Sequence, residues 1–419
     1  MPKTLQQYYD EERTKILKNC TACGQCVQKC PAMQAVEEEG YSPREVQLKV
    51  LDFLRNGTVS SEVYTRAYGC MECFGCVKGQ CPQGLNPLLI NEIIKWEYSR
   101  QNIIPITCND LTDKNAKQRV LSSIQVPKET FQKIFTPSEK KTAKYVFFPG
   151  CNVYHQPDKL LQALDILDMI GEDYAFIPGL DYCCCNNYIV EGETEKAYAS
   201  SQELVAKIAE YNPEAVIFWC PTCLCRFDMT VSKLFDTSFE MMSLPQYITQ
   251  NMHKLPFKKA VNKTVTLHEA CKATYMGLDE VSVREIIRHI PGVTFTEMPR
   301  HGAKTVCCGN FSMGRFPDAM QQVMHSRLQE AEDTGADVMV DVCHACHNLF
   351  VKQETRYDLD ISNYISLLAK ALGTGREDKY KQYKKWGDPD RILEDAAEFV
   401  EQSDYSREII ERVVKDNFT

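Results

Sequence analysis

The sequence predicts a mixed fold: a mainly helical, cysteine-rich N-terminal region, a duplicated α/β domain with parallel strands, and a helical C-terminal tail. Three observations predict it. The first 100 residues hold eight cysteines in two groups, and residues 143–373 run twice through one order of strands, helices and cysteines. Residues 374–419 are charged and have helix-like apolar spacing. A chain of 419 residues is long enough for several domains, each with its own core.

The composition excludes several classes of protein. With 48 Lys+Arg against 57 Asp+Glu the net charge is −9, which argues against a nucleic-acid binder. No run of about 18 apolar residues predicts a membrane span, and the polar residues 1–15 show no secretory signal. The 21 cysteines are therefore expected to be reduced metal ligands in the cytoplasm rather than disulfides.

The N-terminal domain is expected over residues 1–100, with helices at 44–55 and 86–100. Asn86 is a candidate cap for the second helix, and Pro87 suits its first turn. Residues 101–142 are polar and contain three prolines, so they are interpreted as a linker with one or two short helices.

The duplicated region is divided into domains at 143–260 and 261–373. Each copy is expected to have a first strand (145–148; 265–267), a helix (159–170; 281–290), a long helix (193–211; 317–334) and a later strand (215–219; 337–342). The intervals from Cys185 to Cys220 and from Cys308 to Cys343 are equal, which indicates duplication. Alternating strands and helices predict parallel sheets, whose C-terminal strand edge binds ligands. Several cysteines follow these strands. The tail, residues 374–419, is interpreted as a solvated pair of helices, at 392–400 and 409–414, in preference to a dedicated docking element.

Two cysteine motifs occupy the N-terminal domain. They read Cys20-x2-Cys23-x2-Cys26-x3-Cys30-Pro31 and Cys70-x2-Cys73-x2-Cys76-x4-Cys81-Pro82, the second with an extra residue at Gly79–Gln80. Such runs hold cubane [4Fe–4S] clusters, and in two-cluster ferredoxins the fourth cysteine binds the other cluster. Crossed ligation would give Cys20, Cys23, Cys26 and Cys81 to one cluster, and Cys70, Cys73, Cys76 and Cys30 to the other. Zinc also binds Cys-x2-Cys, but it does not explain a third close cysteine followed by Cys-Pro.

The duplicated region carries a longer pattern: Cys151-x32-Cys184-Cys185-x34-Cys220-x2-Cys223, then Cys271-x35-Cys307-Cys308-x34-Cys343-x2-Cys346. This pattern resembles the two CCG domains of heterodisulfide reductase catalytic subunits. The preceding motifs resemble the two-cluster ferredoxin of the same enzyme, fused as in its single-chain, membrane-linked form. The resemblance covers about residues 15–350.

The resemblance implies a noncubane [4Fe–4S] cluster in each five-cysteine set, with a disulfide substrate between the two clusters. The implied ligands are Cys151, Cys184, Cys185, Cys220 and Cys223 in the first set, and Cys271, Cys307, Cys308, Cys343 and Cys346 in the second. One departure is that the first copy reads Cys183-Cys184-Cys185-Asn186, where the second has Cys307-Cys308-Gly309. Asn tolerates the left-handed conformation better than most residues, so the sequence leaves two alternatives for the first set: a retained cluster or an altered one. Cys183 and Cys225 stay unassigned, and Cys108 is interpreted as a buried apolar residue.

Four histidines, His155, His268, His344 and His347, lie beside these motifs and are candidate proton donors to a leaving thiolate. A supporting hydrogen bond is the more common role for each. His268, three residues before Cys271, is the preferred catalytic candidate. Lys272 and Arg226 are candidates for binding an anionic substrate.

No dinucleotide fingerprint or Walker loop is present, so neither flavin nor nucleotide is expected in this chain. Electrons would then come from a flavin-containing or cytochrome partner subunit, and contact with a membrane would be through a partner. The preferred function is an anaerobic, heterodisulfide-reductase-like catalytic subunit that acts on a small thiol or disulfide. The alternative is a pure electron relay, as in glycolate or lactate oxidation or anaerobic aromatic-ring reduction.

Overall fold

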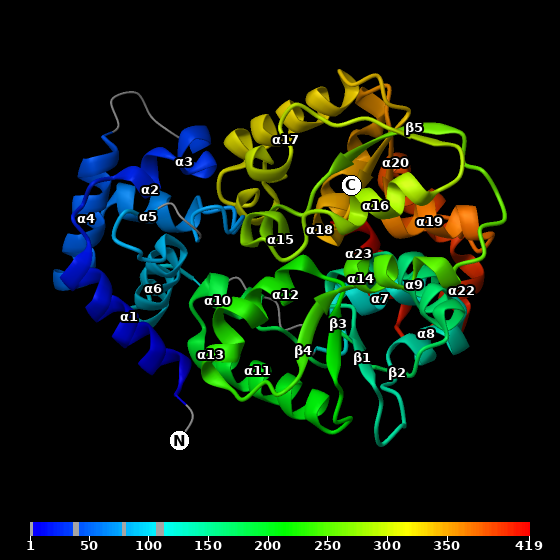
Figure 1. Ribbon diagram of the computed structural model, residues 1–419, viewed down its shortest axis with the longest axis horizontal. Coiled ribbons are helices and arrows are strands. Elements are labelled where there is room, and N and C mark those ends of the chain that lie inside the picture. The colour runs from blue at the N-terminus through cyan, green and yellow to red at the C-terminus, as the bar shows by residue number, and fades with distance from the viewer. Residues whose placement is uncertain (1–2, 37–41, 78–80, 106–112) are drawn as a thin grey trace.

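The computed structural model describes residues 3–36, 42–77, 81–105 and 113–419 (Figure 1). The expectations for Gly79–Gln80 and Cys108 lie outside these residues. The N-terminal helices form one lobe, and the two α/β units lie beside it, one above the other in the view of Figure 1. The predicted fold class is confirmed.

The N-terminal lobe is helical. Its helices are α1 (Leu5–Asn19), α2 (Gln25–Gln28), α3 (Pro31–Val36), α4 (Pro43–Asn56), α5 (Ser61–Tyr68) and α6 (Pro87–Arg100). The predicted helices correspond to α4 and α6. Ser42 caps α4 and Asn86 caps α6, and in each helix a proline follows the cap. The sequence analysis did not predict α1, because only three of its side chains are buried and its pattern is mostly polar.

The described part of residues 101–142 contains two short helices, α7 (Lys117–Ser123) and α8 (Lys128–Ile134), as expected. The first α/β unit follows with β1 (Tyr145–Phe148), η1 (Asn152–His155), α9 (Pro157–Ile170), β2 (Tyr174–Phe176), α10 (Asn186–Glu191), α11 (Thr194–Ala209), β3 (Ala215–Phe218), α12 (Pro221–Arg226), η2 (Phe227–Val231), α13 (Ser232–Leu234), β4 (Glu240–Ser243), α14 (Leu244–Gln250) and η3 (Met252–Lys254).

The second unit repeats this order. It comprises β5 (Lys263–His268), α15 (Cys271–Met276), α16 (Ser282–His289), β6 (Val293–Phe295), η4 (Gly302–Lys304), η5 (Asn310–Ser312), α17 (Pro317–Glu332), β7 (Val338–Asp341), α18 (His344–Phe350), η6 (Val351–Arg356), β8 (Asp360–Asn363) and α19 (Tyr364–Leu372). The repeated order confirms the duplication of the α/β unit.

Each α/β unit has one four-stranded parallel sheet, ordered β2-β1-β3-β4 in the first and β6-β5-β7-β8 in the second. The central strands are buried: β3 and β7 expose none of their residues. The fourth strands, β4 and β8, were not predicted, because EMMS and DISN lack the β-branched and aromatic content typical of strands. In both units, candidate cysteines follow the C-terminal ends of the first and third strands in sequence.

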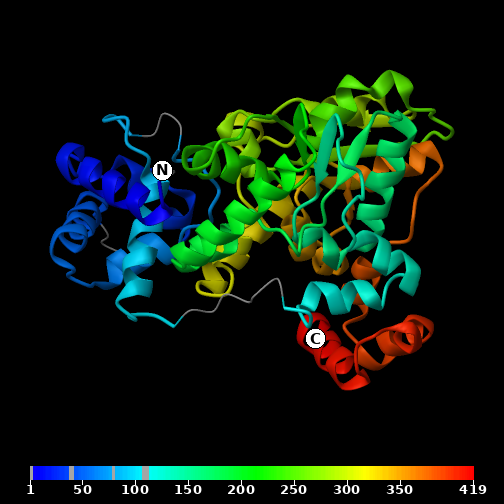
Figure 2. The same ribbon diagram turned by 90° about the horizontal axis from the view of Figure 1, so that it is seen from below.

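The C-terminal region has four helices, α20 (Lys379–Trp386), α21 (Pro389–Asp395), α22 (Ala397–Gln402) and α23 (Arg407–Phe418). The interpretation as a solvated pair is wrong. Tyr380, Tyr383, Ile410 and Phe418 are fully or almost fully buried, and α23 packs on α7. Figure 2 shows these helices gathered beneath the α/β units beside α7 and α8. The linker helices and the tail therefore form one layer.

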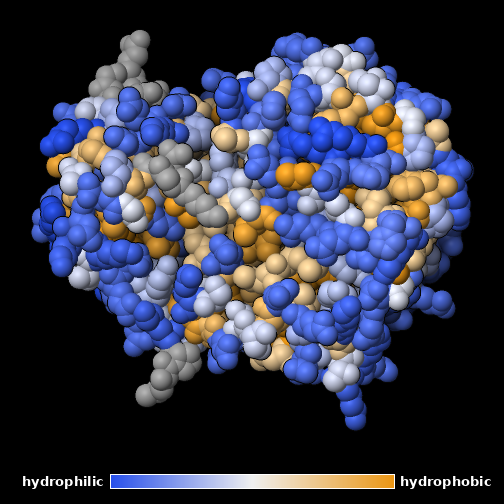
Figure 3. All heavy atoms as spheres, viewed as in Figure 1, coloured by the Kyte–Doolittle hydropathy of each residue, from blue (hydrophilic) through white to orange (hydrophobic). Residues whose placement is uncertain are grey.

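The surface agrees with the charged composition. Figure 3 shows hydrophilic side chains over most of one face, with hydrophobic ones gathered in its middle, where the lobe and both α/β units meet. Among the described residues, no helix combines the length and apolar character needed to cross a bilayer.

Gly192 supplies a test of the packing between the lobe and the first unit. It ends α10 at φ 81°, and a Cβ there would lie 2.3 Å from the Lys95 backbone oxygen of α6. We expect Gly192→Ala to lower the free energy of unfolding by more than the about 1–2 kcal/mol of left-handed strain alone, because backbone atoms must also move. The measurement is thermal unfolding.

The matched control is Gly57→Ala. Gly57 has φ 76°, and a Cβ there meets nothing within 4 Å. Equal losses of stability in the two variants would contradict a tight contact between α6 and α10.

Candidate metal centres

The first candidate centre is a cavity lined by Cys20, Cys23, Cys26 and Cys81. Gln47 of α4 holds two of these residues: its Nε2 lies 3.6 Å from Cys20 Sγ, and its Oε1 lies 3.5 Å from Cys26 Sγ. The turn needs Gly24 at φ 76°, since a Cβ there would lie 2.6 Å from the backbone of Pro43. Cys23 is the one exposed residue among the described cysteines, so this cavity lies near the surface.

The second candidate centre is a cavity of about 240 Å³ between the N-terminal lobe and the second α/β unit. The cysteines on its wall are Cys26, Cys30, Cys70, Cys73 and Cys76. The two cavities therefore combine cysteines from both sequence motifs, as crossed ligation requires. Cys26 lines both cavities, which brings the two centres side by side.

Arg66 of α5 provides a buried cation beside the second cavity. Its Nη1 lies 4.0 Å from Cys30 Sγ, and its Nε and Nη2 have no hydrogen-bond partner among the described residues. Burial lowers the pKa of Arg66. The negative charge of the neighbouring Cys26 and Cys30 outweighs this effect, so the pKa is raised above its ordinary value. A fixed positive charge with free donors suits a cavity that holds thiolates. The sequence analysis missed this residue.

The five cysteines of the second α/β unit converge at the C-terminal edge of its sheet. Cys308 Sγ and Cys346 Sγ lie 3.2 Å apart, and Cys307 also interacts with Cys271 and Cys308 through its thiol. Cys346 in turn interacts with Cys343. The structure thus brings together the whole predicted second set.

The first α/β unit has the same network, shifted by one residue from the predicted pair. Cys183 interacts with Cys151 and Cys184, and Cys184 interacts with Cys223. These contacts match those of Cys307 with Cys271 and of Cys308 with Cys346. Cys183 and Cys184, rather than Cys184 and Cys185, therefore correspond to Cys307 and Cys308.

Backbone geometry gives the reason for this correction. Cys185 has φ 66° and Gly309 has φ 88°, so Cys185 takes the place of the glycine. The Cys185 backbone nitrogen lies 3.4 Å from Cys183 Sγ, as the Gly309 nitrogen lies 3.5 Å from Cys307 Sγ. Asn186 has a negative φ and only begins α10, so it does not replace the glycine. The thiol contacts and the backbone thus favour Cys183 and Cys184 over the pair that the equal sequence intervals predict.

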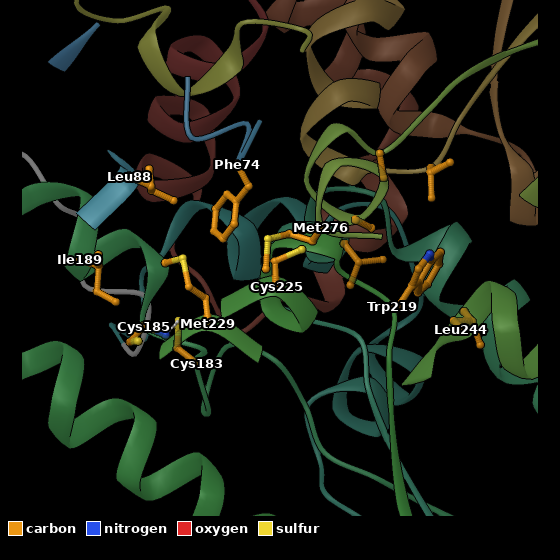
Figure 4. Close-up of a cluster of buried hydrophobic side chains, with 14 of the residues drawn as sticks. Phe74, Leu88, Cys183, Cys185, Ile189, Trp219, Cys225, Met229, Leu244 and Met276 are labelled. Atoms are coloured by element: carbon orange, nitrogen blue, oxygen red, sulfur yellow. Dashed lines mark hydrogen bonds between the residues drawn. The ribbon is translucent and has the colours of Figure 1, made fainter. Parts of the chain in front are cut away.

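The two cysteines of this unit outside the five-cysteine network, Cys185 and Cys225, are buried in apolar surroundings. Cys185 belongs to the apolar cluster that contains Leu88 and Ile189, and Figure 4 shows it beside Ile189. Cys225 is fully buried near Met276 in the same figure. Burial raises the pKa of both thiols. Neither thiol joins the five-cysteine network among the described contacts.

The second cavity adjoins the five-cysteine set of the second α/β unit. Cys307 Sγ lies 3.9 Å from the backbone oxygen of Met71, two residues before Cys73. Tyr275 packs against Gly75, where a Cβ would lie 3.2 Å from its ring. Burial raises the pKa of Cys73, and Cys307 raises it further. The candidate centres thus form a series from the exposed Cys23 to this set.

A buried ion-pair network joins the lobe to the first α/β unit. Arg226 Nη1 donates to Glu92 Oε1 at 2.7 Å, and Arg226 Nη2 donates to Asn186 Oδ1 at 2.8 Å and lies 3.5 Å from Glu72 Oε2. Lys95 Nζ donates to Glu72 Oε1 at 3.0 Å. All five side chains are at most 3% exposed. Arg226 is thus fully engaged, which removes it as the predicted group for an anionic substrate.

Of the four candidate histidines, His268 lies closest to a cysteine set. One of its ring nitrogens is within 4.8 Å of Cys308 Sγ and Cys346 Sγ. Its Nδ1 accepts a hydrogen bond from Arg327 Nε at 3.1 Å, so in the neutral ring the proton is on Nε2. Burial, followed by Arg327, lowers the pKa of His268 well below its ordinary value. His268 is therefore a neutral hydrogen-bond donor.

The other three histidines have different surroundings. Burial lowers the pKa of His155 to about 3, and His344 packs edge-on against Trp219. His347 bonds Asp341 at 2.7 Å and Asp378 at 2.9 Å. Burial lowers the pKa of His347, but the two carboxylates outweigh it and leave the pKa raised. Asp378 also pairs with the buried Lys159 at 2.6 Å, so this network ties the tail to both units.

Comparison with known proteins agrees with this division. Residues 16–85 match the 4Fe-4S dicluster domain, and residues 145–228 and 265–350 each match the cysteine-rich domain named CCG. One subunit of the dihydromethanophenazine:CoB–CoM heterodisulfide reductase of Methanosarcina acetivorans is 25% identical, over 86% of this chain and 95% of its own length.

Two further relatives are named as subunits of other enzymes. One subunit of the fumarate reductase (CoM/CoB) of Methanothermobacter marburgensis is 21% identical over 86% of this chain and 74% of its own length. The iron–sulfur subunit of the Escherichia coli glycolate oxidase is 20% identical over 80% of this chain and 90% of its own length.

The fold, the cysteine sets and these matches define an iron–sulfur oxidoreductase subunit with a 4Fe-4S dicluster domain and two CCG domains. Over most of its length the chain is homologous to the matched subunit of the Methanosarcina heterodisulfide reductases, which confirms the resemblance predicted from the cysteine spacing.

The Arg226 network supplies a stability test. We expect Arg226→Met to lower the free energy of unfolding by about 3–5 kcal/mol, because Glu72 and Glu92 would keep their charge in an apolar interior with Lys95, and more weakly Lys272, to compensate. Denaturant unfolding under anaerobic conditions measures it.

Arg407→Met is the control, because Arg407 is 77% exposed and its pair with Glu411 is on the surface. A loss below about 1 kcal/mol in both variants would contradict the role given to Arg226.

Proposed function

We propose that this chain is the iron–sulfur subunit of a heterodisulfide-reductase-like complex in which a small disulfide is reduced, or formed from two thiols, at the CCG sites. The observation that carries the proposal is that both CCG domains assemble a complete network of five cysteines at the edge of the sheet. Once Cys183 is included, the first set lacks no member.

The ligand sets follow from the cavities and thiol networks. The two cubane clusters would be held by Cys20, Cys23, Cys26 and Cys81, and by Cys30, Cys70, Cys73 and Cys76. The CCG clusters, which we propose are noncubane, would be held by Cys151, Cys183, Cys184, Cys220 and Cys223, and by Cys271, Cys307, Cys308, Cys343 and Cys346. The donor set fits, since thiolates are the usual ligands of iron–sulfur clusters and Arg66 offers positive charge beside the second cubane set.

Such clusters accept and release single electrons, and iron with an open edge can hold a thiolate sulfur. The chain contributes the order of the sites. Cys23 is exposed, which supports contact with a flavin-containing or cytochrome partner subunit at this end of the lobe. Cys307 lies against Met71 of the second cubane loop, which supports the second CCG site as the next in line.

His268 is proposed to donate a hydrogen bond from Nε2 to a sulfur of the second CCG site. Arg327 holds the ring by bonding Nδ1, and the depressed pKa keeps the ring neutral. A neutral donor stabilises sulfur that gains negative charge without adding a full charge to a buried site.

The relay alternative also has a supporting observation. Within each network only Cys151 and Cys343 are partly exposed, and the remaining thiols are buried. Buried thiols leave a disulfide substrate little access to the iron, which favours an electron relay without disulfide chemistry, as in a relative of the E. coli glycolate oxidase iron–sulfur subunit. A cytoplasmic, anaerobic setting is proposed for either function.

The deciding experiment uses the anaerobically purified full chain. The CoB–CoM heterodisulfide named for the relatives, a second disulfide such as cystine, and the matching thiols are each added while the paramagnetic signals are recorded. A changed CCG signal with one of them supports disulfide chemistry. Unchanged signals with all of them overturn it in favour of the relay.

The ligand assignment is tested by iron and acid-labile sulfide content. We expect about 16 iron atoms per chain, from four clusters of four. Cys183→Ser should lower this content, because a ligand is lost from the first CCG site.

Cys185→Gly is the matched variant two residues further along the chain. It should keep the full iron content, because glycine suits the positive φ of that position. The opposite result, with iron lost in Cys185→Gly and kept in Cys183→Ser, would restore the pair expected from the sequence.

A further inference from the structure

Lys272 is a buried cation that forms no ion pair within 4.0 Å among the described residues, and the carboxylate of Glu72 is a more distant electrostatic neighbour. Lys272 is the second residue of α15, directly after Cys271, and is 5% exposed. Its Nζ has no hydrogen-bond partner among the described residues. The ammonium lies over the rings of Phe74 and Phe311, at 5.0 and 4.2 Å from their centroids. Ring faces offset only part of the cost of burying a full charge.

The second CCG site is the negative region that this cation faces. Lys272 directly follows Cys271, and Phe311, whose ring its ammonium overlies, is two residues after Gly309 of the same site. The two rings come from different segments, since Phe74 belongs to the second cubane loop and Phe311 is two residues after Gly309. Lys272 thus lies where the second cubane loop meets the second CCG site.

The two CCG sites differ in the cation that lies next to the cysteine set. Cys151 corresponds to Cys271, so the position of Lys272 is taken by the neutral Asn152 in the first unit. The cation next to the first cysteine set is Arg226, and Glu92, Glu72 and Asn186 already bind its guanidinium. The first unit therefore has a cation held by two carboxylates, whereas Lys272 in the second unit forms no ion pair among the described residues.

We propose that Lys272 raises the reduction potential of the second CCG site and so makes it the preferred acceptor of an electron from the second cubane site. This inference rests on the proposed ligand sets. A positive charge in a medium of low dielectric favours the more negative, reduced state of its neighbour. The transfer moves one electron: the second cubane site is oxidised and the second CCG site is reduced, with no bond or proton changed.

The test is a reductive titration of the anaerobic full chain, followed by electron paramagnetic resonance. The signal of the second CCG site is identified as the one absent from Cys346→Ser. In Lys272→Met the equilibrium constant for electron transfer to this site should fall about tenfold, a shift of about 59 mV to lower potential for a one-electron couple. Lys272→Arg should keep the wild-type value, and Asn152→Ala should leave the second site unchanged.

An unchanged potential in Lys272→Met, with its clusters retained, overturns the inference. If Lys272→Met loses iron, the reduction potential of the second CCG site is measured in Glu72→Gln instead. The expected shift is then in the opposite direction. Removing a negative charge near Lys272 should raise the potential, and an unchanged potential there also overturns the inference. A wild-type chain without a second CCG signal overturns the proposed function instead.

Discussion

The structure depends on how negative charge is compensated where water is excluded. Eighteen candidate ligand thiols gather in two cavities and two sheet edges, and most of them are buried. Burial alone would keep thiols protonated and unable to bind metal. The fold answers with fixed cations of two kinds. Arg66 and Lys272 keep their charge unpaired beside sulfur, whereas Arg226 is paired with carboxylates and holds the lobe to the first unit.

This division assigns different tasks to similar residues. A paired cation contributes to stability and to the geometry of the interface, but it offers little charge to its surroundings. An unpaired one is costly to bury and is retained only where another negative group offsets it. The two halves of the duplicated region differ in this way: the first half has a cation paired with carboxylates, and the second has Lys272, which forms no ion pair among the described residues.

The sequence predicted the fold class, the duplication and the cysteine motifs because these depend on local periodicity and on spacing within single loops. It failed where long-range contacts decide. The strands β4 and β8 are formed from weak strand sequences that pair only because a sheet edge is available. In the run Cys183-Cys184-Cys185, the spacing alone does not show which two thiols are ligands. That choice depends on thiol contacts and on the backbone φ, which only the structure gives. Arg66 and Glu72 had no local signal, since their partners lie in distant segments.

The close contact of α6 with α10 has a consequence for kinetics. With both cubane sites and both CCG sites in one chain, and with Lys95 against Gly192 at the junction, the distance between donor and acceptor is fixed by covalent and packing constraints. Under the proposed function, electron transfer between these sites is unimolecular, with an effective concentration set by the fold rather than by abundance. Dilution should slow the exchange of electrons with a partner and leave the internal step unchanged.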